Sequence, residues 1–276
     1  MGQVFVNFWN STGLSHFVED PVLGIKYLIM YVIVGILVYL AVVKKFEPLL
    51  LLPIAFGMLL ANLPGANLFH MEFFHGQDVQ WANVATQGGL LDLIYLGVKL
   101  GIYPSLIFMG VGAMTDFTPL IANPKSLLLG AAAQLGVFVA FFAALFLGFT
   151  LPEAASIGII GGADGPTAIL VTKTLAPGLL SAIAIAAYSY MALIPLIQPP
   201  FMNMFTTKKE RMVVMQTLRP VSKIEQIAFP VIVTLVVVLL LPDAAPLIGF
   251  LMLGNLFTVC GVTDRLSKTA QNELIN

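Results

Sequence analysis

Charged side chains are scarce in this sequence. Asp, Glu, Lys and Arg make up 10% of the 276 residues, whereas hydrophobic residues make up 59%. A soluble globular domain carries roughly 25% charged residues. This deficit, together with a mean hydropathy of +0.96, excludes an ordinary soluble domain and predicts a protein embedded in a lipid bilayer. The net charge of −1 gives no indication of nucleic-acid binding.

Cysteine is almost absent as well. The one cysteine, Cys260, excludes an intramolecular disulfide framework and any zinc site built from cysteines. The three histidines, His16, His70 and His75, lack the spacing of metal ligands, so we interpret them as loop residues.

Long apolar runs dominate the chain and predict an all-α polytopic membrane protein. We expect one membrane domain over residues 1–276, in which residues 1–23 do not span the bilayer and residues 206–223 form a basic cytoplasmic loop. The run at 49–63 is short, and the run at 93–114 is interrupted by Lys99, Gly101 and Pro104. The predicted runs are 24–43, 49–63, 93–114, 127–147, 179–197, 228–241 and 247–260.

Basic residues set the predicted orientation. Residues 206–223 hold five of them, and an excess of Lys and Arg marks cytoplasmic loops. Lys44 and Lys45 mark another cytoplasmic end. If every other apolar run crosses once, both basic segments share a side only when residues 157–172 enter the membrane and return. We therefore expect a broken or re-entrant element there. The basic residues of the loop are Lys208, Lys209, Arg211, Arg219 and Lys223.

The stretch "SIGIIGGADGPTAILVT" at 156–172 carries the chemistry. An Asp at bilayer depth costs about 2.5–3.5 kcal/mol, and broken backbone is tolerated there only inside protein or beside a watery cavity. Such breaks supply free carbonyl oxygens, to which Asp164 adds a carboxylate and Thr167 a hydroxyl. An oxygen-only shell suits a hard cation such as sodium. The residues that disfavour a continuous helix are Gly161, Gly162, Gly165 and Pro166.

A purely structural interpretation of this stretch stays open. Gly158 and Gly162 form a G-x-x-x-G pattern that is also typical of close helix packing. Asp164 is equally a good helix N-cap, with Pro166 near the first helical position. The spacing of the glycines fits neither common nucleotide-binding motif.

Other polar residues within apolar runs are weaker candidates. Tyr188 and Tyr190 are two residues apart, so they point to different faces of a helix and at most one faces a site. Asp116 is either a loop residue or a second acid near the pathway. Asn255 is expected to bond another helix or to contact an ion.

Five long motifs carry a family resemblance that covers nearly the whole chain from about Gly24. The chain resembles the beta subunit of the sodium-translocating biotin-dependent decarboxylases, a family that includes the oxaloacetate, methylmalonyl-CoA, glutaconyl-CoA and malonate enzymes. The motifs are "KKFEPLLLLPIAFG", "IFMGVGAMTDFTPLIANPKSLLLGAAAQ", "IGIIGGADGPTAI", "AAYSYMALIPLIQPP" and "LPDAAPLIGFLMLGNL".

The resemblance implies a sodium pump in a bacterial inner membrane. In such complexes a carboxyltransferase alpha subunit loads a biotin carrier subunit, a small single-span subunit accompanies the beta subunit, and a homo-oligomer is left open. The beta subunit decarboxylates carboxybiotin and exports Na⁺ while a proton is consumed. Asp164 matches the family's essential aspartate, and Tyr190 matches its functional tyrosine.

As a mechanism we hypothesise that Asp164 binds Na⁺ and exchanges it for a proton. Thr167 and the backbone carbonyls of Gly161, Gly162 and Gly165 would complete the ligand shell, and Tyr190 would be a proton relay or ligand. Two alternatives are a sodium-coupled secondary transporter and a non-catalytic membrane anchor.

The family pattern continues into a second half with a motif spaced N-x3-G-x4-S-x6-R, which does not occur in this sequence. The expectation is therefore that the chain is a fragment or a natural truncation. It would be one half of an inverted-repeat fold, and inactive alone.

Overall fold

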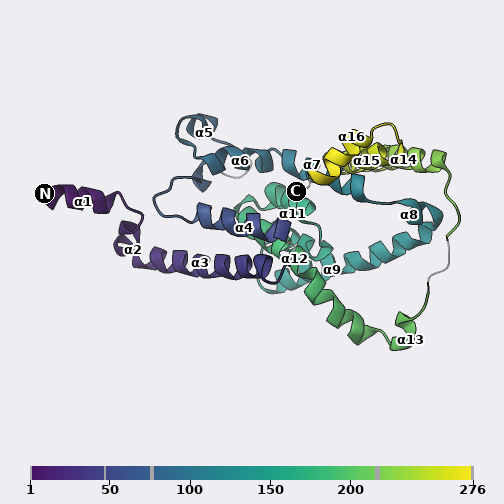
Figure 1. Cartoon of the computed structure of the whole chain (residues 1–276), viewed down its shortest axis with the longest axis horizontal. Coiled ribbons are helices and arrows are strands. Elements are labelled where there is room, and N and C mark those ends of the chain that lie inside the picture. Colours follow the sequence, from purple (N-terminus) through teal and green to yellow (C-terminus); the bar gives the residue numbers. More distant parts are fainter. Residues whose placement is uncertain (1, 47, 75–77, 215–217, 275–276) are drawn as a thin grey trace. The chain divides into compact units, whose positions relative to one another are not determined.

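The computed structural model describes residues 2–46, 48–74, 78–214 and 218–274, and the secondary structure among them is helical, without a strand (Figure 1). His75 lies outside these described residues. The α-helices are α1 (Gly2–Asn10), α2 (Ser15–Glu19), α3 (Pro21–Val42), α4 (Pro48–Ala61), α5 (Trp81–Gln87), α6 (Leu90–Lys99), α7 (Ile102–Met114), α8 (Thr118–Ala122), α9 (Leu127–Phe146), α10 (Leu151–Gly158), α11 (Gly165–Leu175), α12 (Leu180–Phe205), α13 (Lys208–Arg211), α14 (Lys223–Leu240), α15 (Ala245–Val259) and α16 (Asp264–Asn272). The 3₁₀ turns are η1 (Met71–Phe73), η2 (Pro124–Ser126), η3 (Ile159–Gly162), η4 (Pro177–Leu179) and η5 (Pro242–Ala244).

Five helices are long and apolar enough to cross a bilayer, which confirms the prediction of an all-α polytopic membrane protein. α6 and α7 would add a sixth span as a pair bent by 64°. The short run at 49–63 is α4, which is apolar but below spanning length. The spanning segments within the described ranges are Pro21–Val42, Pro124–Phe146, Pro177–Phe205, Lys223–Leu240 and Pro242–Val259.

The bend between α6 and α7 follows from local chemistry at Gly101. Gly101 has φ +81°, a left-handed conformation that glycine adopts without strain. Lys173 of α11 lies against this bend, and its Nζ donates a hydrogen bond of 3.4 Å to the carbonyl oxygen of Lys99 at the end of α6. A cation at a helix C-terminus complements the helix dipole. The sequence interruption at Lys99 and Gly101 is thus a real break.

The chain divides into two compact units, one of Met1–Leu96 with Tyr188–Ile197 and one of Gly97–Ala187 with Gln198–Asn276. The prediction of one membrane domain over 1–276 stays a prediction. In the first unit α3 packs with α4, and the hydroxyl of Tyr31 donates a 3.1 Å hydrogen bond to the carbonyl of Asn62.

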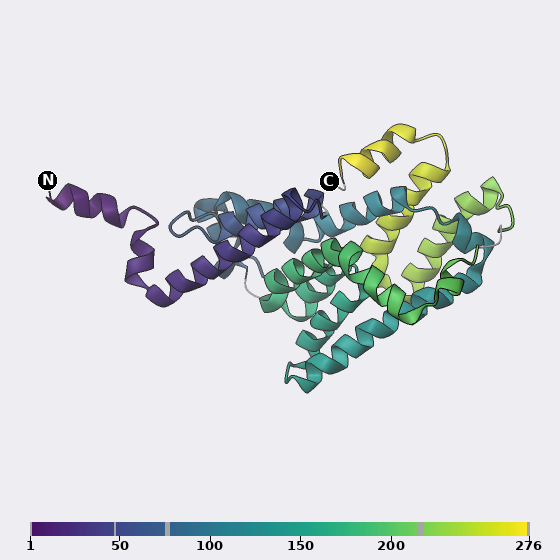
Figure 2. The same cartoon turned by 60° about the horizontal axis from the view of Figure 1, so that its bottom comes forward.

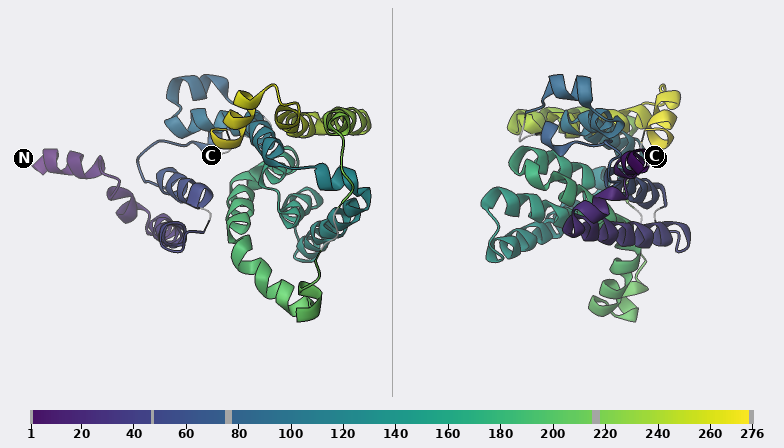
Figure 3. Two further views of the ribbon diagram at one scale, coloured as in Figure 1. Left: turned by 45° about the vertical axis from the view of Figure 1, so that its right-hand side comes forward. Right: turned by 90° about the vertical axis from the view of Figure 1, so that its left-hand side faces the viewer.

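The polar segment between α4 and α6 is held by a buried carboxylate in the first unit. Asp92 is fully buried, and its carboxylate accepts three bonds: from the backbone N–H of His70 (2.7 Å), from the Nδ1 side of the His70 ring (2.7 Å) and from the N–H of Gly89 (2.8 Å). The His70 ring stacks on Phe73, which belongs to an apolar cluster with Phe74 and residues of α5 and α6, the stacked blue helices of Figure 3.

In the second unit, α9 and α10 form a hairpin that turns at Gly148, where φ is +93° (Figure 2). α7 crosses α15 at two glycines, where backbone touches backbone. A methyl group built on Gly112 would lie 1.8 Å from the carbonyl oxygen of Leu251, and one built on Gly254 would lie 1.9 Å from that of Met109. Small residues at such crossings let membrane helices approach closely.

A polar network closes the C-terminal end of α7. Asn255 donates to the carbonyl of Thr115 at 2.9 Å, Thr258 to that of Ala113 at 2.8 Å, and Gln271 of α16 also to that of Ala113 at 2.9 Å. The last carbonyls of a helix lack intrahelical donors. Of the two roles considered for Asn255, the structure shows the bond to another helix.

One local prediction was wrong. His16 lies in the short helix α2 and not in a loop. The segment after Asp116 contains α8 and η2, and Pro119 and Pro124 each stand near the start of a helical turn, where their missing N–H has no cost.

Candidate functional site

The predicted break lies between α10 and α11. α10 begins with a capping box in which the Glu153 carboxylate accepts hydrogen bonds from the N–H (2.9 Å) and hydroxyl (2.7 Å) of Thr150. The helix tightens into η3 and then ends at Ala163, which has φ +53° and ψ +40°. A left-handed alanine is unusual, and it turns the chain out of the helix path. The backbone is therefore broken inside the predicted stretch, at Ala163, between the glycines of η3 and the start of α11.

Asp164 is the N-cap of α11. Its Oδ1 accepts the N–H of Thr167 at 3.3 Å, and its Oδ2 accepts the Thr167 hydroxyl at 2.5 Å. Pro166 follows at the start of the helix. The structural interpretation of Asp164 as an N-cap is thus correct, whatever else the carboxylate does. Asp164 and Thr167 are half-buried, and Gly165 between them is buried.

The capping hydrogen bonds leave lone pairs of Asp164 and Thr167 available to bind a cation. The Thr167 hydroxyl donates its single proton to Asp164, so its lone pairs stay available to accept a cation. A carboxylate has about four lone-pair directions, of which Thr167 uses two. Both oxygens belong to the same end of α11, three residues apart. The two predicted side-chain ligands are therefore together.

α9 fixes the glycines of the break by direct backbone contact. A methyl group built on Gly161 would lie 2.9 Å from the carbonyl oxygen of Gly136 in α9. One built on Gly158 would lie 2.9 Å from Cβ of Phe141. Gly161 and Gly158 thus serve close packing, as the G-x-x-x-G interpretation expects for Gly158, and the same contact holds the carbonyl groups of η3 in place.

Tyr190 belongs to the other compact unit and lies in α12, with an exposed fraction of 37%. Tyr188 is half-buried and is not without an interaction partner. The two tyrosines thus differ in exposure. Ser189 between them has a buried hydroxyl without a hydrogen-bond partner among the described residues.

Asp116 is exposed between α7 and α8, and its Oδ1 accepts the N–H of Thr118 at 2.9 Å. Hydrogen bonds from Thr118 hold the pKa of Asp116 below its usual range. Of the two roles considered for Asp116, the structure shows the loop residue. Like Asp164, Asp116 accepts a hydrogen bond from a backbone N–H a few residues later in the chain.

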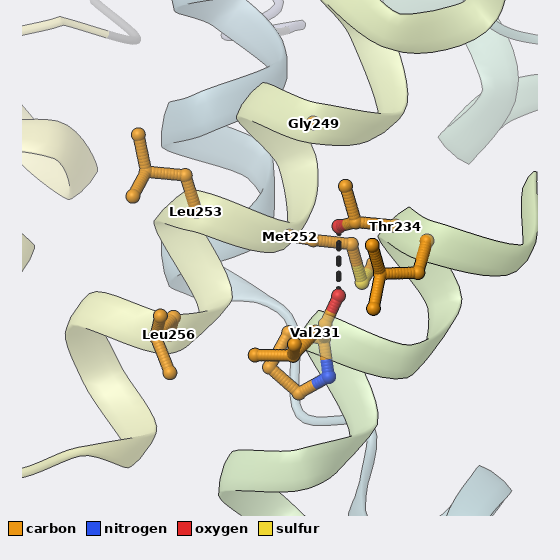
Figure 4. Close-up of a pocket in the computed structure, with 8 residues that line it drawn as sticks. Val231, Thr234, Gly249, Met252, Leu253 and Leu256 are labelled. Atoms are coloured by element: carbon orange, nitrogen blue, oxygen red, sulfur yellow. Dashed lines mark hydrogen bonds between the residues drawn. The ribbon is translucent and has the colours of Figure 1, made fainter. Parts of the chain in front are cut away.

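An apolar groove of about 250 Å³ lies between α14 and α15, where Val231 and Thr234 face Met252 and Leu253 (Figure 4). The Thr234 hydroxyl donates to the carbonyl of Pro230 in its own helix, so the groove offers little polar chemistry. Within the described ranges, no three His, Cys, Asp or Glu side chains gather into a metal site.

Sequence reasoning passed over Gln134, the polar side chain of α9, which lies against Gly162. Its only sequence signal is one amide inside an otherwise apolar run. No pattern in the sequence pointed to Asp92, because its partner His70 lies 22 residues earlier.

The profile of one protein family, described as the Na⁺-transporting oxaloacetate decarboxylase beta subunit, matches residues 26–276. The chain is 54% identical over 285 residues to the methylmalonyl-CoA decarboxylase subunit beta of Propionigenium modestum, which covers 100% of this chain and 71% of that protein. It is 57% identical over 248 residues to the glutaconyl-CoA decarboxylase subunit beta of Acidaminococcus fermentans (90% and 62% covered). It is 49% identical over 310 residues to the oxaloacetate decarboxylase beta chain of Klebsiella pneumoniae (96% and 70% covered). The chain thus spans 62 to 71% of the length of these relatives.

Proposed function

Because the chain belongs to the family of Na⁺-transporting oxaloacetate decarboxylase beta subunits, we propose that it decarboxylates carboxybiotin and couples this reaction to Na⁺ export. The relatives are beta subunits of methylmalonyl-CoA, glutaconyl-CoA and oxaloacetate decarboxylases. Their shared feature is a multi-subunit, biotin-dependent complex with a multi-pass bacterial membrane subunit. The acid that feeds the complex differs among them, so our proposal concerns only the common membrane step.

The proposed reaction consumes one proton. The bond between the biotin ring nitrogen and the carboxyl carbon breaks, CO₂ leaves, and the nitrogen takes up the proton. A pump must tie this proton uptake to the movement of Na⁺. A carboxylate that holds either a proton or a sodium ion, but not both, provides that link.

Asp164 is our candidate for that carboxylate. The observation that carries the proposal is its position: a half-buried carboxylate at a helix break, bound to a hydroxyl whose lone pairs are free. Thr167 and the backbone carbonyls of Gly161, Gly162 and Gly165 would complete an oxygen shell for Na⁺. The carbonyls of Gly161 and Gly162 are among the last before the break and lack helical donors, which makes such groups ligands in other membrane proteins, whereas Gly165 is the first residue of α11. Tyr190 is proposed as a proton relay or ligand.

The partners are proposed from the family. A carboxyltransferase alpha subunit would load the biotin carrier, and the carrier would bring carboxybiotin to the cytoplasmic side. A small single-span subunit would accompany the chain in the bilayer. The basic loop 206–223 would face the cytoplasm, on the side where the carrier arrives.

Asp164→Asn tests the proposal in the full decarboxylase complex. Asn keeps the N-cap but removes the exchangeable charge, so Na⁺-dependent decarboxylation of carboxybiotin should fall by at least about a hundredfold, a loss typical of essential acid–base groups. Asp116→Asn is the matched control and should stay near wild type, because Asp116 is exposed in a turn.

A second measurement does not need turnover. Dicyclohexylcarbodiimide modifies protonated carboxyl groups in apolar surroundings, and a bound Na⁺ would protect Asp164 from it. Mass spectrometry of the labelled peptide should show protection that increases with Na⁺ concentration. Normal Na⁺-dependent turnover in Asp164→Asn would refute the role of Asp164. A complex that ignores free carboxybiotin but moves a solute with Na⁺ would instead be a secondary transporter, and one that does neither would be an anchor.

A further inference from the structure

Gln134 is an isolated polar side chain in a membrane span. Every other side chain of α9 (Leu127–Phe146) is apolar or absent. Gln134 is exposed, and its side chain makes no hydrogen bond with the residues that the structure describes. An amide facing lipid has nothing to bond, whereas polar residues within spans normally face a partner or a watery path. The position of Gln134 therefore needs a polar neighbour.

The contact between α9 and the break places Gln134 beside the glycines that precede Asp164. Gln134, Val137 and Phe141 are spaced i, i+3 and i+7, so they share one face of α9. Phe141 contacts Gly158, Val137 contacts Gly161, and Gln134 contacts Gly162. As residue numbers fall along α9 they rise along the break, so the two segments run antiparallel. The polar member of this face meets the part of the break next to Asp164.

The amide is aimed at the glycine. A methyl group built on Gly162 would lie 3.5 Å from Oε1 of Gln134 and 4.0 Å from Nε2. One turn further along the same face, a methyl group on Gly130 would meet nothing within 4 Å. The described contact between α9 and the break thus ends at Gln134, where the amide borders open space.

We propose that Gln134 is a further residue of the cation site, whose side-chain oxygen binds the sodium ion held at Asp164. The inference rests on the proposed function, because it assumes a cation at the break. It adds a ligand from a second helix, so that the ion would be held between α9 and the α10–α11 break instead of by one loop alone. A neutral amide oxygen is a ligand that hard cations accept.

Gln134→Leu in the full membrane-embedded complex removes the oxygen and nearly preserves the volume. The Na⁺ concentration that half-protects Asp164 from dicyclohexylcarbodiimide should rise by about threefold to tenfold, the loss typical of one neutral polar contact. Gln134→Glu keeps an oxygen and should protect at wild-type or lower Na⁺. Leu135→Ala, at the neighbouring position with an exposed fraction of 63%, is the control and should not shift the curve.

The outcomes separate the two proposals. A half-protecting Na⁺ concentration within about twofold of wild type in Gln134→Leu would overturn the role of Gln134. An equal shift in Leu135→Ala would also overturn it, since that result reports general loosening of α9. Loss of Na⁺ protection in wild type itself would refute the proposed function instead. Gel filtration of each complex shows whether the variants assemble. If the Gln134→Leu complex does not assemble, the Na⁺ protection of Gln134→Glu still tests the proposal.

Discussion

The crossing of α7 and α15 makes a sharp prediction about Gly254. This glycine has no space for a side chain: its added methyl group would lie 1.9 Å from the carbonyl oxygen of Met109 and 2.9 Å from the N–H nitrogen of Ala113. Both are backbone atoms of α7, so neither can rotate away. Gly254→Ala therefore has to push the two helices apart.

The expected cost is large. Real Cβ atoms do not approach other heavy atoms closer than 3.0 Å, so the helices must separate by at least about 1 Å at the crossing. That separation also loosens Gly112, packed equally tightly on Leu251, and lengthens the bond from Asn255 to Thr115. Overpacking costs 1–3 kcal/mol when side chains can adjust, and here they cannot, so we expect a loss above about 3 kcal/mol.

Gly249→Ala is the matched control in the same helix. A methyl group there meets nothing within 4 Å and would only fill part of the groove in Figure 4. Because alanine favours a helix over glycine by about 1 kcal/mol, Gly249→Ala should leave stability unchanged or raise it slightly. Thermal unfolding of the detergent-solubilised complex should separate the two variants by many degrees. Equal midpoints would show that α7 and α15 do not cross as described.

Two further predictions concern the packing at the break and the hydrogen bonds to the buried Asp92. Gly161→Ala forces a methyl group against the backbone of Gly136 at 2.9 Å, whereas Gly162→Ala meets side-chain atoms at 3.4 Å or more. Gly161→Ala should lower the free energy of unfolding by about 1–3 kcal/mol and weaken the Na⁺ protection of Asp164, whereas Gly162→Ala should be near neutral for stability. Similar unfolding midpoints for the two variants would contradict this geometry. Asp92→Asn leaves one of three buried donors facing an amide NH₂, and it should cost about 1–3 kcal/mol in thermal unfolding of the complex. Asp78→Asn, which is exposed in the same segment, should have no such cost. Equal effects of these two changes would show that the hydrogen bonds to Asp92 do not hold this segment.

The spans and the break were predictable because they depend on local chemistry. Apolar length marks a membrane helix directly, and the interruption at Lys99 and Gly101 became a bend of 64°. Asp164, Gly165 and Pro166 form a strong N-cap signal, which the structure realises. The sequence left open whether this signal was structural or functional. The structure shows that the cap is real, and a cap does not exclude a ligand.

Contacts between distant segments were not predictable from the sequence. Asn255 was assigned only a choice between a helix and an ion, because its acceptor, Thr115, lies 140 residues earlier. His70 looked like an ordinary loop residue, since its tie to Asp92 depends on how the segment folds back. The sequence alone could not show that Gln134 lies beside the break, because this depends on how α9 packs against it. Each case depends on which face of a helix meets which neighbour, which periodicity alone does not determine.

Electrostatics favours the Asp164 break over the Lys99 break as the proposed cation site. At the Lys99 break, the ammonium group of Lys173 already bonds the carbonyl oxygen of Lys99 at the end of α6. Two unit charges 4 Å apart repel by about 4 kcal/mol at an effective dielectric constant of 20. A sodium ion is therefore disfavoured there. At the Asp164 break the positive end of α11 would repel a cation too, but the Asp164 carboxylate stands at that end and reverses the local charge. The same chain thus has two helix breaks, and the sign of the side chain at each one decides which of them suits an ion.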